Sequence, residues 1–283
     1  MRTPIRTLLV FGVLAALGTA RGEPAAPSGN LAPPATQPLL PVSKTPEPTT
    51  QPRPYTYVLV HGAWAGGWEW KKVGNLLLQD GHTVYRPTLT GQGERVHLAT
   101  KDVDLNTHIQ DIVNVILFED LHDVVLMGHS YGGMVITGVA DRVPDRIKCL
   151  VYVDAFLPED GDSANSLSGR KLPSVDGFIP PPKGTRVEGK DPPPYLAPMC
   201  EKIFETQEVL KNPAARKIPA AYILCVPKGR TPEKAAFYKS YLRAQQRGYF
   251  TETIESDHIV SQTHPMQLAP LLERAPEDAT VKP

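Results

Sequence analysis

The sequence has few cysteines, no net charge and no long hydrophobic run. Three cysteines among 283 residues are too few and too scattered for a disulfide scaffold or a zinc cage. The 30 basic residues are balanced by 30 acidic ones, so the chain lacks the basic face with which nucleic-acid-binding and membrane-surface proteins meet phosphates. No apolar stretch reaches the roughly 18 to 20 residues of a membrane span. Metal spacings such as H-E-x-x-H are also absent, and we therefore expect no metal, no cofactor and no nucleic-acid partner.

Two segments precede the first pattern typical of a folded domain. Arginines within the first six residues stand before an apolar run at 8–17, which small residues ending at Ala20 follow. This order predicts a secretory signal peptide within residues 1–22, cut after Ala20 or shortly beyond. Residues 23–54 contain ten prolines and no apolar periodicity, which predicts a disordered linker. We expect a secreted or periplasmic protein whose folded domain covers residues 55–283.

From residue 55 onward, short apolar runs alternate with helical patterns. The runs are rich in aliphatic and β-branched residues, as expected of strands that are covered on both faces of a sheet. The clearest helical pattern covers 104–119, where apolar residues recur at helical spacing and form one stripe. The alternation predicts an α/β fold in which helices cover both faces of a mostly parallel sheet. Strands are predicted at 57–60, 82–86, 123–127, 149–153, 221–226 and 249–255.

The interval 157–217 interrupts this alternation. It contains two runs of three prolines, several glycines and only a weak helical pattern near 199–210. A long excursion of this kind inside an α/β domain is usually a functional insertion. We expect a lid without strands, and a floppy surface loop is the alternative.

The pentapeptide G-H-S-Y-G at 128–132 is the clearest chemical motif. It follows the predicted strand 123–127 and precedes an apolar segment, 134–143, that is predicted as a helix. Small residues on both sides of the serine permit a sharp, strained strand-to-helix turn, which lifts the hydroxyl above the sheet. The helix N-terminus at such a turn favours developing negative charge. The motif therefore predicts Ser130 as a nucleophile.

A serine hydroxyl needs a neighbouring base near neutral pH, and the histidines are the candidates. Among eight histidines, His258 is best placed, because it follows the last predicted strand and precedes a final helical segment. His264 is the nearest competitor, but the proline after it indicates a helix start. We expect His129 to pack beneath the turn and to border the substrate pocket rather than act as the base. The remaining candidates are expected to be solvated: His82, His97, His108 and His122.

A second loop, H-G-A-W at 61–64, follows the first predicted strand. Such a loop can aim a backbone N–H at the oxygen that becomes negative during acyl transfer. We predict an oxyanion hole formed by the N–H groups of Ala63 and Tyr131, each worth roughly 3 to 4 kcal/mol in the transition state. Trp64 is expected to border the substrate pocket.

Together these motifs resemble the α/β-hydrolase superfamily, and more closely its branch of plant methyl esterases and hydroxynitrile lyases with their bacterial esterase relatives. The matching stretches are H-G-A-W-A-G-G-W-E-W at 61–70, G-H-S-Y-G-G-M at 128–134 and S-D-H at 256–258. With the strand pattern, the resemblance covers most of residues 55–272. It implies an α/β-hydrolase fold with a lid, and a carboxylate that orients the catalytic histidine.

The chain departs from that branch at the position of the acid. The branch usually carries an aspartate after the strand that here is 221–226, where this sequence has Lys228. Asp154 is our candidate instead, because it closes the preceding predicted strand, 24 residues after Ser130. Some haloalkane dehalogenases of the same superfamily place their acid at the end of this strand. Asp257 is less suitable, since adjacent side chains on an extended turn diverge, and an Asp154 that only caps its strand is the alternative reading.

The combination of Ser130, His258 and Asp154 predicts a secreted serine hydrolase that cleaves carboxylic esters of small, fairly hydrophobic molecules through an acyl-enzyme. We expect a small-molecule ester as its partner, a monomer or homodimer, and no membrane span after signal cleavage. Two other classes stay open. One is a carbon–carbon lyase of the hydroxynitrile type, for which Lys228 lies in the relevant region; the other is a ligand-binding protein on a hydrolase fold.

Overall fold

A computed structural model describes residues 54–186 and 189–279 of the chain. The predicted signal peptide, 1–22, and all but the last residue of the predicted linker, 23–54, lie outside these residues. Within the described ranges, none of the helices has both the length and the apolar character needed to cross a membrane.

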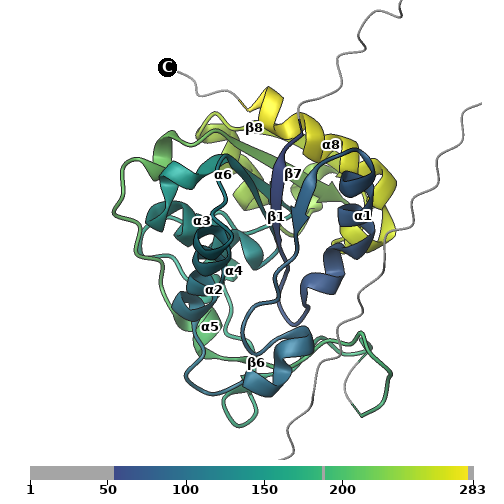
Figure 1. Ribbon diagram of the computed structural model, residues 1–283. Coiled ribbons are helices and arrows are strands. Elements are labelled where there is room, and N and C mark those ends of the chain that lie inside the picture. Colours follow the sequence, from purple (N-terminus) through teal and green to yellow (C-terminus); the bar gives the residue numbers. More distant parts are fainter. Residues whose placement is uncertain (1–53, 187–188, 280–283) are drawn as a thin grey trace, which may run out of the picture. The chain divides into compact units, whose positions relative to one another are not determined.

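A six-stranded parallel sheet forms the centre of the domain (Figure 1). Its strand order is β2-β1-β3-β4-β7-β8, and each strand agrees with its predicted range to within two residues at either end. The predicted α/β architecture is therefore confirmed. The strands are β1 (Thr56–Val60), β2 (Thr83–Tyr85), β3 (Val124–His129), β4 (Ile147–Val153), β7 (Ala220–Val226) and β8 (Phe250–Glu255).

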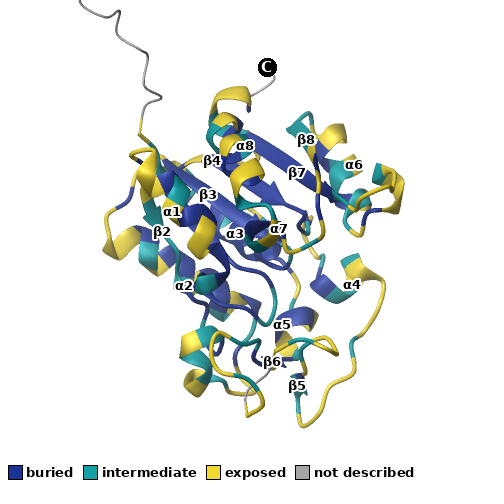
Figure 2. Ribbon diagram, turned by 90° about the vertical axis from the view of Figure 1, so that its right-hand side faces the viewer, coloured by how far each residue is buried: buried dark blue, intermediate teal, exposed yellow. Residues whose placement is uncertain are grey.

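Helices cover both faces of this sheet, because successive side chains of a strand point to opposite faces. In β1, Tyr57 and Leu59 pack into one apolar cluster with residues of α1 and α8, whereas Val58 and Val60 pack into another with residues of α2 and α3. Figure 2 shows the resulting buried sheet between partly exposed helices. The helices are α1 (Lys71–Gln79), α2 (Leu105–Phe118), α3 (Gly132–Arg142), α6 (Tyr238–Gln246), α7 (Val260–Thr263) and α8 (Pro265–Asp278), with single 3₁₀ turns at Gly67–Trp70, Gly93–Leu98, Pro144–Arg146, Ala215–Lys217 and Pro232–Lys234.

The interval 157–217 contains strands, contrary to the prediction. Two-residue strands β5 (Phe178–Ile179) and β6 (Met199–Cys200) pair antiparallel. The weak pattern at 199–210 is helical only in α5 (Lys202–Glu205), and α4 (Ala164–Ser168) is a second short helix. Strands this short carry no detectable alternation, and their pairing joins residues about twenty positions apart, so local sequence could not reveal them.

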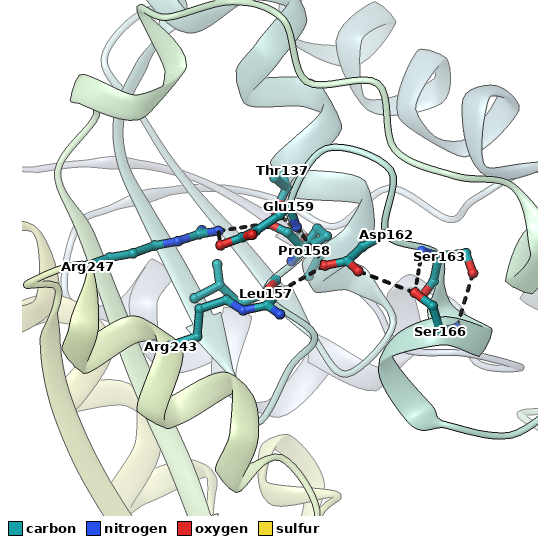
Figure 3. Close-up of polar contacts among 10 residues, drawn as sticks. Thr137, Leu157, Pro158, Glu159, Asp162, Ser163, Ser166, Arg243 and Arg247 are labelled. Atoms are coloured by element: carbon teal, nitrogen blue, oxygen red, sulfur yellow. Dashed lines mark hydrogen bonds and ion pairs between the residues drawn. The ribbon is translucent and has the colours of Figure 1, made fainter.

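The segment that enters this interval is attached to α6 by two arginines (Figure 3). Arg243 Nη1 donates to the Leu157 carbonyl at 2.6 Å and to Asp162 Oδ2 at 2.9 Å. Arg247 Nη2 donates to the Pro158 carbonyl at 3.1 Å. The entrance of the insertion is thus held against α6 by charge-assisted hydrogen bonds.

Candidate active site

Ser130 lies on the sharp turn between β3 and α3. Its φ is +54°, a left-handed conformation that is uncommon for a residue with a side chain. The turn closes tightly, because a Cβ atom on Gly128 would lie only 2.5 Å from the Gly132 carbonyl oxygen. The small residues predicted for the turn are therefore required by close backbone approach, and the strained serine is displayed at the carboxyl end of the sheet.

The structure brings Ser130, His258 and Asp154 into one hydrogen-bonded chain. His258 Nε2 is 2.9 Å from Ser130 Oγ, and His258 Nδ1 is 2.6 Å from Asp154 Oδ2. The three residues follow β3, β8 and β4, whose carboxyl ends lie at one edge of the parallel sheet. With the proton on Nδ1 directed at the carboxylate, Nε2 is free to accept the serine proton.

Asp154 is buried and its second oxygen also has a partner. Asp154 Oδ1 accepts a hydrogen bond from the Cys225 N–H of β7 at 3.1 Å, so the carboxylate is oriented by the neighbouring strand. The other acids do not compete for His258. Asp257 is exposed and accepts from the Ile259 N–H and the Thr263 hydroxyl, while Lys228, at the position where the family's acid was expected, is exposed.

The loop after β1 carries the first of the two predicted oxyanion donors, the Ala63 N–H. The Gly62 N–H donates to Glu69 Oε2 at 3.1 Å, and the Trp64 N–H points to Met199 Sδ at 2.8 Å. Within the described part of the chain, the Ala63 and Tyr131 N–H groups have no acceptor. Because a Cβ on Gly62 would lie 3.2 Å from Ser130 Cβ, this loop directly abuts the serine. Both predicted oxyanion donors are therefore available beside Ser130.

His61 orients the peptide that carries the Ala63 N–H. His61 is fully buried, and its Nδ1 lies 2.7 Å from the Gly62 carbonyl oxygen, while its Nε2 accepts from the Leu89 N–H. Burial lowers the pKa of His61, which keeps the imidazole neutral with one donor and one acceptor. In a planar trans peptide the Gly62 C=O and the Ala63 N–H point in opposite directions, so holding the carbonyl also aims the N–H.

Trp64 and His129, both predicted to border the substrate pocket, have different surroundings. Trp64 is partly exposed and contacts the insertion, since its Nε1 donates to the Ile179 carbonyl at 3.1 Å and its ring lies 5.7 Å from that of Phe204. His129 is only 3% exposed and lies behind His258, with ring centroids 4.5 Å apart. The pocket-lining prediction for His129 is therefore wrong, because the ring is enclosed by Glu69, Trp70 and His258.

Sequence reasoning missed Glu69, which is 3% exposed and pairs with His129 Nδ1. Burial by itself raises the pKa of Glu69, but the charge of His129 and the hydrogen bonds from His129 and Gly62 outweigh it and lower the pKa. Burial likewise opposes protonation of His129, yet Glu69 raises its pKa, so the two form a buried ion pair. The sequence offers one indication of this pair, because Glu69 stands between Trp68 and Trp70. An acid in such an apolar segment is expected to be buried, and a buried acid needs a partner.

Two of the histidines expected to be solvated are in fact buried. His82 contacts Glu273 at 3.0 Å across the amino end of the sheet. His108 Nδ1 lies 3.1 Å from the Tyr131 hydroxyl, and burial lowers its pKa to about 3. Both predictions are wrong because each histidine is buried against a partner that is distant in the sequence. A polar residue within a helix or strand pattern gives no indication of such a partner. Among the residues that the structure describes, no three His, Cys, Asp or Glu side chains are grouped so that they could hold a metal ion.

Comparisons with known proteins agree with this architecture. A sequence model of the alpha/beta hydrolase family matches residues 57–271. A carbendazim hydrolyzing esterase of Nocardioides sp. (strain SG-4G) is 55% identical over 117 residues, which are 41% of this chain and 48% of that protein. An alpha-hydroxynitrile lyase of Arabidopsis thaliana is 36% identical over 110 residues, 38% of this chain and 42% of that protein.

These matches span less than half the length of the curated relatives. A solved structure is similar over a longer part of the chain. It is an extracellular alpha/beta-hydrolase from a Paenibacillus species, described as sharing structural and functional homology with tobacco salicylic acid binding protein 2. Its TM-score is 0.63 at 27% identity, and the match covers 78% of this chain and 99% of that chain. The family match covers most of the described domain, and its residue range includes the serine turn and nearly all of the six-stranded sheet. The chain therefore belongs to the alpha/beta hydrolase family.

Proposed function

We propose that this protein is a secreted serine hydrolase that cleaves carboxylic esters of small, fairly hydrophobic molecules. The observation that carries the proposal is the hydrogen-bonded chain from Ser130 Oγ through His258 to Asp154 Oδ2, with distances of 2.9 and 2.6 Å. Relatives named as esterases, at up to 55% identity over part of the chain, support the same chemistry.

In the proposed reaction, His258 Nε2 takes the proton of Ser130 as Oγ attacks the ester carbonyl carbon. The carbonyl oxygen becomes negative and accepts hydrogen bonds from the Ala63 and Tyr131 N–H groups. When the carbon–oxygen bond to the alcohol breaks, His258 returns the proton to the leaving alkoxide. Water then attacks the acyl-enzyme with His258 as base, the acid leaves and Ser130 is regenerated. Asp154 keeps the proton on Nδ1 and stabilises the imidazolium that forms in each half.

The side chains near this chain of residues favour an apolar substrate. Phe237 stacks on His258 with ring centroids 5.1 Å apart, and Phe156 packs edge-on against Phe237. Phe204 of the insertion lies 5.9 Å from the Tyr131 ring. We assign the 157–217 insertion the role of a lid that selects the ester, because Phe204 brings it to the residue after the nucleophile.

Hydrolysis of p-nitrophenyl acetate and butyrate, with carbendazim as a further substrate, tests the proposal. Ser130→Ala should reduce activity to background, and Asp154→Asn should lower kcat by about 10³-fold or more, because the amide no longer holds the productive tautomer. Asp257→Asn is the matched control: the same change on the exposed neighbour of His258 should leave kcat within about twofold. Full activity in Asp154→Asn would assign the acid elsewhere.

The competing functions give different results in the same experiment. A lyase of the hydroxynitrile type, as in the Arabidopsis relative, would release cyanide from a cyanohydrin and leave the nitrophenyl esters intact. A binding protein would retain a ligand without turnover. Either result would reject the esterase proposal.

Secretion is tested by the N-terminus of the mature protein. Expression of the full chain in a bacterial host with a signal peptidase should yield protein outside the cytoplasm that begins between residues 21 and 23, because small residues end at Ala20. Protein that stays in the cytoplasm with Met1 intact would contradict the assignment.

A further inference from the structure

A buried carboxylate joins the two halves of the candidate site. Glu69 follows the loop that carries Ala63, and its Oε2 accepts the Gly62 N–H at 3.1 Å. Its Oε1 pairs with His129 Nδ1. Glu69 is therefore held by the oxyanion loop on one side and by the residue before Ser130 on the other. An ionised carboxylate in such a dry place requires a charged or hydrogen-bonding partner on each oxygen, and both are present.

His129 transmits this contact to the base. His129 Nε2 lies 2.7 Å from the backbone carbonyl oxygen of His258, and the two imidazole rings are 4.5 Å apart. A doubly protonated His129 can donate from both nitrogens at once, to Glu69 and to the His258 carbonyl. Phe237 covers the opposite face of His258 at 5.1 Å. The base is thus held between a charged ring and an aromatic ring.

Titratable groups face His129 from four neighbouring elements. Glu69 contacts the ring from the 3₁₀ turn Gly67–Trp70, and His258 lies 4.5 Å from it after β8. Asp154 lies beyond His258 at the end of β4, and His61 directly follows β1. The two rings are in direct contact, so a positive charge on His129 stands next to the base.

From these contacts we propose that Glu69 and His129 form a positioning ion pair, in which one carboxylate holds the oxyanion loop while its imidazolium partner holds the His258 backbone and tunes the proton affinity of the base. This rests on the proposed function, because it assigns a role toward the same nucleophile. Neither residue touches the ester.

Two substitutions at residue 69 separate charge from contact. Glu69→Gln keeps the shape, and its amide accepts from the Gly62 N–H while donating to a neutral His129. The acid limb of kcat/KM should move by at least about 0.5 unit to higher pH, because a positive charge next to His258 is lost. Glu69→Ala also frees the Gly62 N–H, so kcat should fall about 10-fold or more with KM within about threefold.

The control is a second His–Glu pair. His82 and Glu273 are 3.0 Å apart at the amino end of the sheet, so Glu273→Gln makes the same chemical change far from Ser130. It should leave the pH profile and kcat of the ester assay unchanged. If both Glu69 variants only lower the melting temperature, with an unmoved acid limb and normal kcat per folded enzyme, the pair is merely structural and the proposal fails.

A readout without turnover distinguishes failure of this proposal from failure of the proposed function. In ¹⁵N-histidine spectra, assigned with His129→Gln, His129 should carry protons on both nitrogens at pH 7 in the wild type and on one nitrogen in Glu69→Gln. A neutral His129 in the wild type overturns the pair, whether or not esters are cleaved. An inactive wild type that still shows the charged His129 would reject the ester substrate and leave the ion pair standing.

Discussion

At the serine turn, the backbone of Phe156 lies so close to Gly133 that no side-chain atom fits at residue 133. A Cβ there would lie 2.0 Å from the Phe156 carbonyl oxygen. The backbone of Phe156 is itself fixed to the turn, because its N–H donates to the Ser130 carbonyl oxygen at 3.0 Å. Gly74 in α1 offers a contrast, because its Cβ would meet the flexible side chain of Arg86. The same substitution thus meets rigid backbone at one site and a movable chain at the other.

Gly133→Ala should therefore lower the free energy of unfolding by at least about 2 kcal/mol, as overpacking against backbone does. Gly74→Ala should be neutral or stabilising by up to about 1 kcal/mol, because alanine favours a helix interior and Arg86 can move aside. Urea unfolding of the two purified variants measures both values. Equal stabilities would mean that the turn adjusts freely, which would contradict the close approach of the Phe156 carbonyl oxygen to Gly133.

At single residues, the sequence predicted chemistry better than surroundings. Ser130, His258 and Asp154 were identifiable because each follows a strand, and strand ends of a parallel sheet meet at one edge. Glu69 was missed because its partners, Gly62 and His129, come together only through the fold. Side-chain burial depends on distant segments, and a local pattern carries no information about them.

At the scale of elements, contacts with α6 fix the first residues of the insertion. Arg243 donates to the Leu157 carbonyl oxygen and to the Asp162 carboxylate, and Asp162 in turn accepts the Glu159 N–H at 2.9 Å (Figure 3). The side chains of Arg243 and Asp162 are only 30% and 25% exposed, so their pairing is less screened than that of a surface ion pair.

Arg243→Ala should destabilise the start of the insertion by about 1–3 kcal/mol, the range for hydrogen bonds to charged groups. Hydrogen exchange of residues 157–163 should accelerate while β3 and β4 stay protected, because the sheet does not depend on this contact. Arg274→Ala is the control, since Arg274 forms an exposed pair with Asp278 one turn away in α8. Unchanged exchange at 157–163 would show that the insertion holds its position without Arg243.

Elements inside the sheet were predictable and those of the insertion were not, for one physical reason. A strand covered on both faces, such as Val124–His129, must be almost wholly apolar, and that requirement is visible in the sequence. The pairing of Phe178–Ile179 with Met199–Cys200 satisfies only a few backbone groups and places weak demands on composition. Where an element buries little apolar area, many sequences are compatible with the same backbone, so the sequence pattern does not predict that element.

For the whole molecule, one buried carboxyl couples folding to pH. Glu208 is 2% exposed and packs against α3 at Gly138, and its Oε1 has no hydrogen-bond partner among the residues that the structure describes. Burial raises its pKa to about 8; Arg142 opposes the rise and Asp141 adds to it. The folded protein therefore keeps this carboxyl protonated at pH values at which the unfolded chain has ionised it.

The sign of the effect follows from proton binding. Between the ordinary pKa of 4.5 and the folded pKa of about 8, the folded state holds a proton that the unfolded state has lost. The contribution of Glu208 to stability is thus fully present below pH 4.5 and declines as pH rises to about 8, by up to about 1.4 kcal/mol per pH unit. The variant Glu208→Gln cannot ionise. The difference between its unfolding free energy and that of the wild type should therefore grow from pH 5 to pH 8, with the variant the more stable. Glu94→Gln is the control, because Glu94 is exposed, and its stability should follow the wild-type curve. Chemical unfolding at several pH values measures the difference, and parallel curves for wild type and Glu208→Gln would mean that Glu208 ionises without cost in the folded protein.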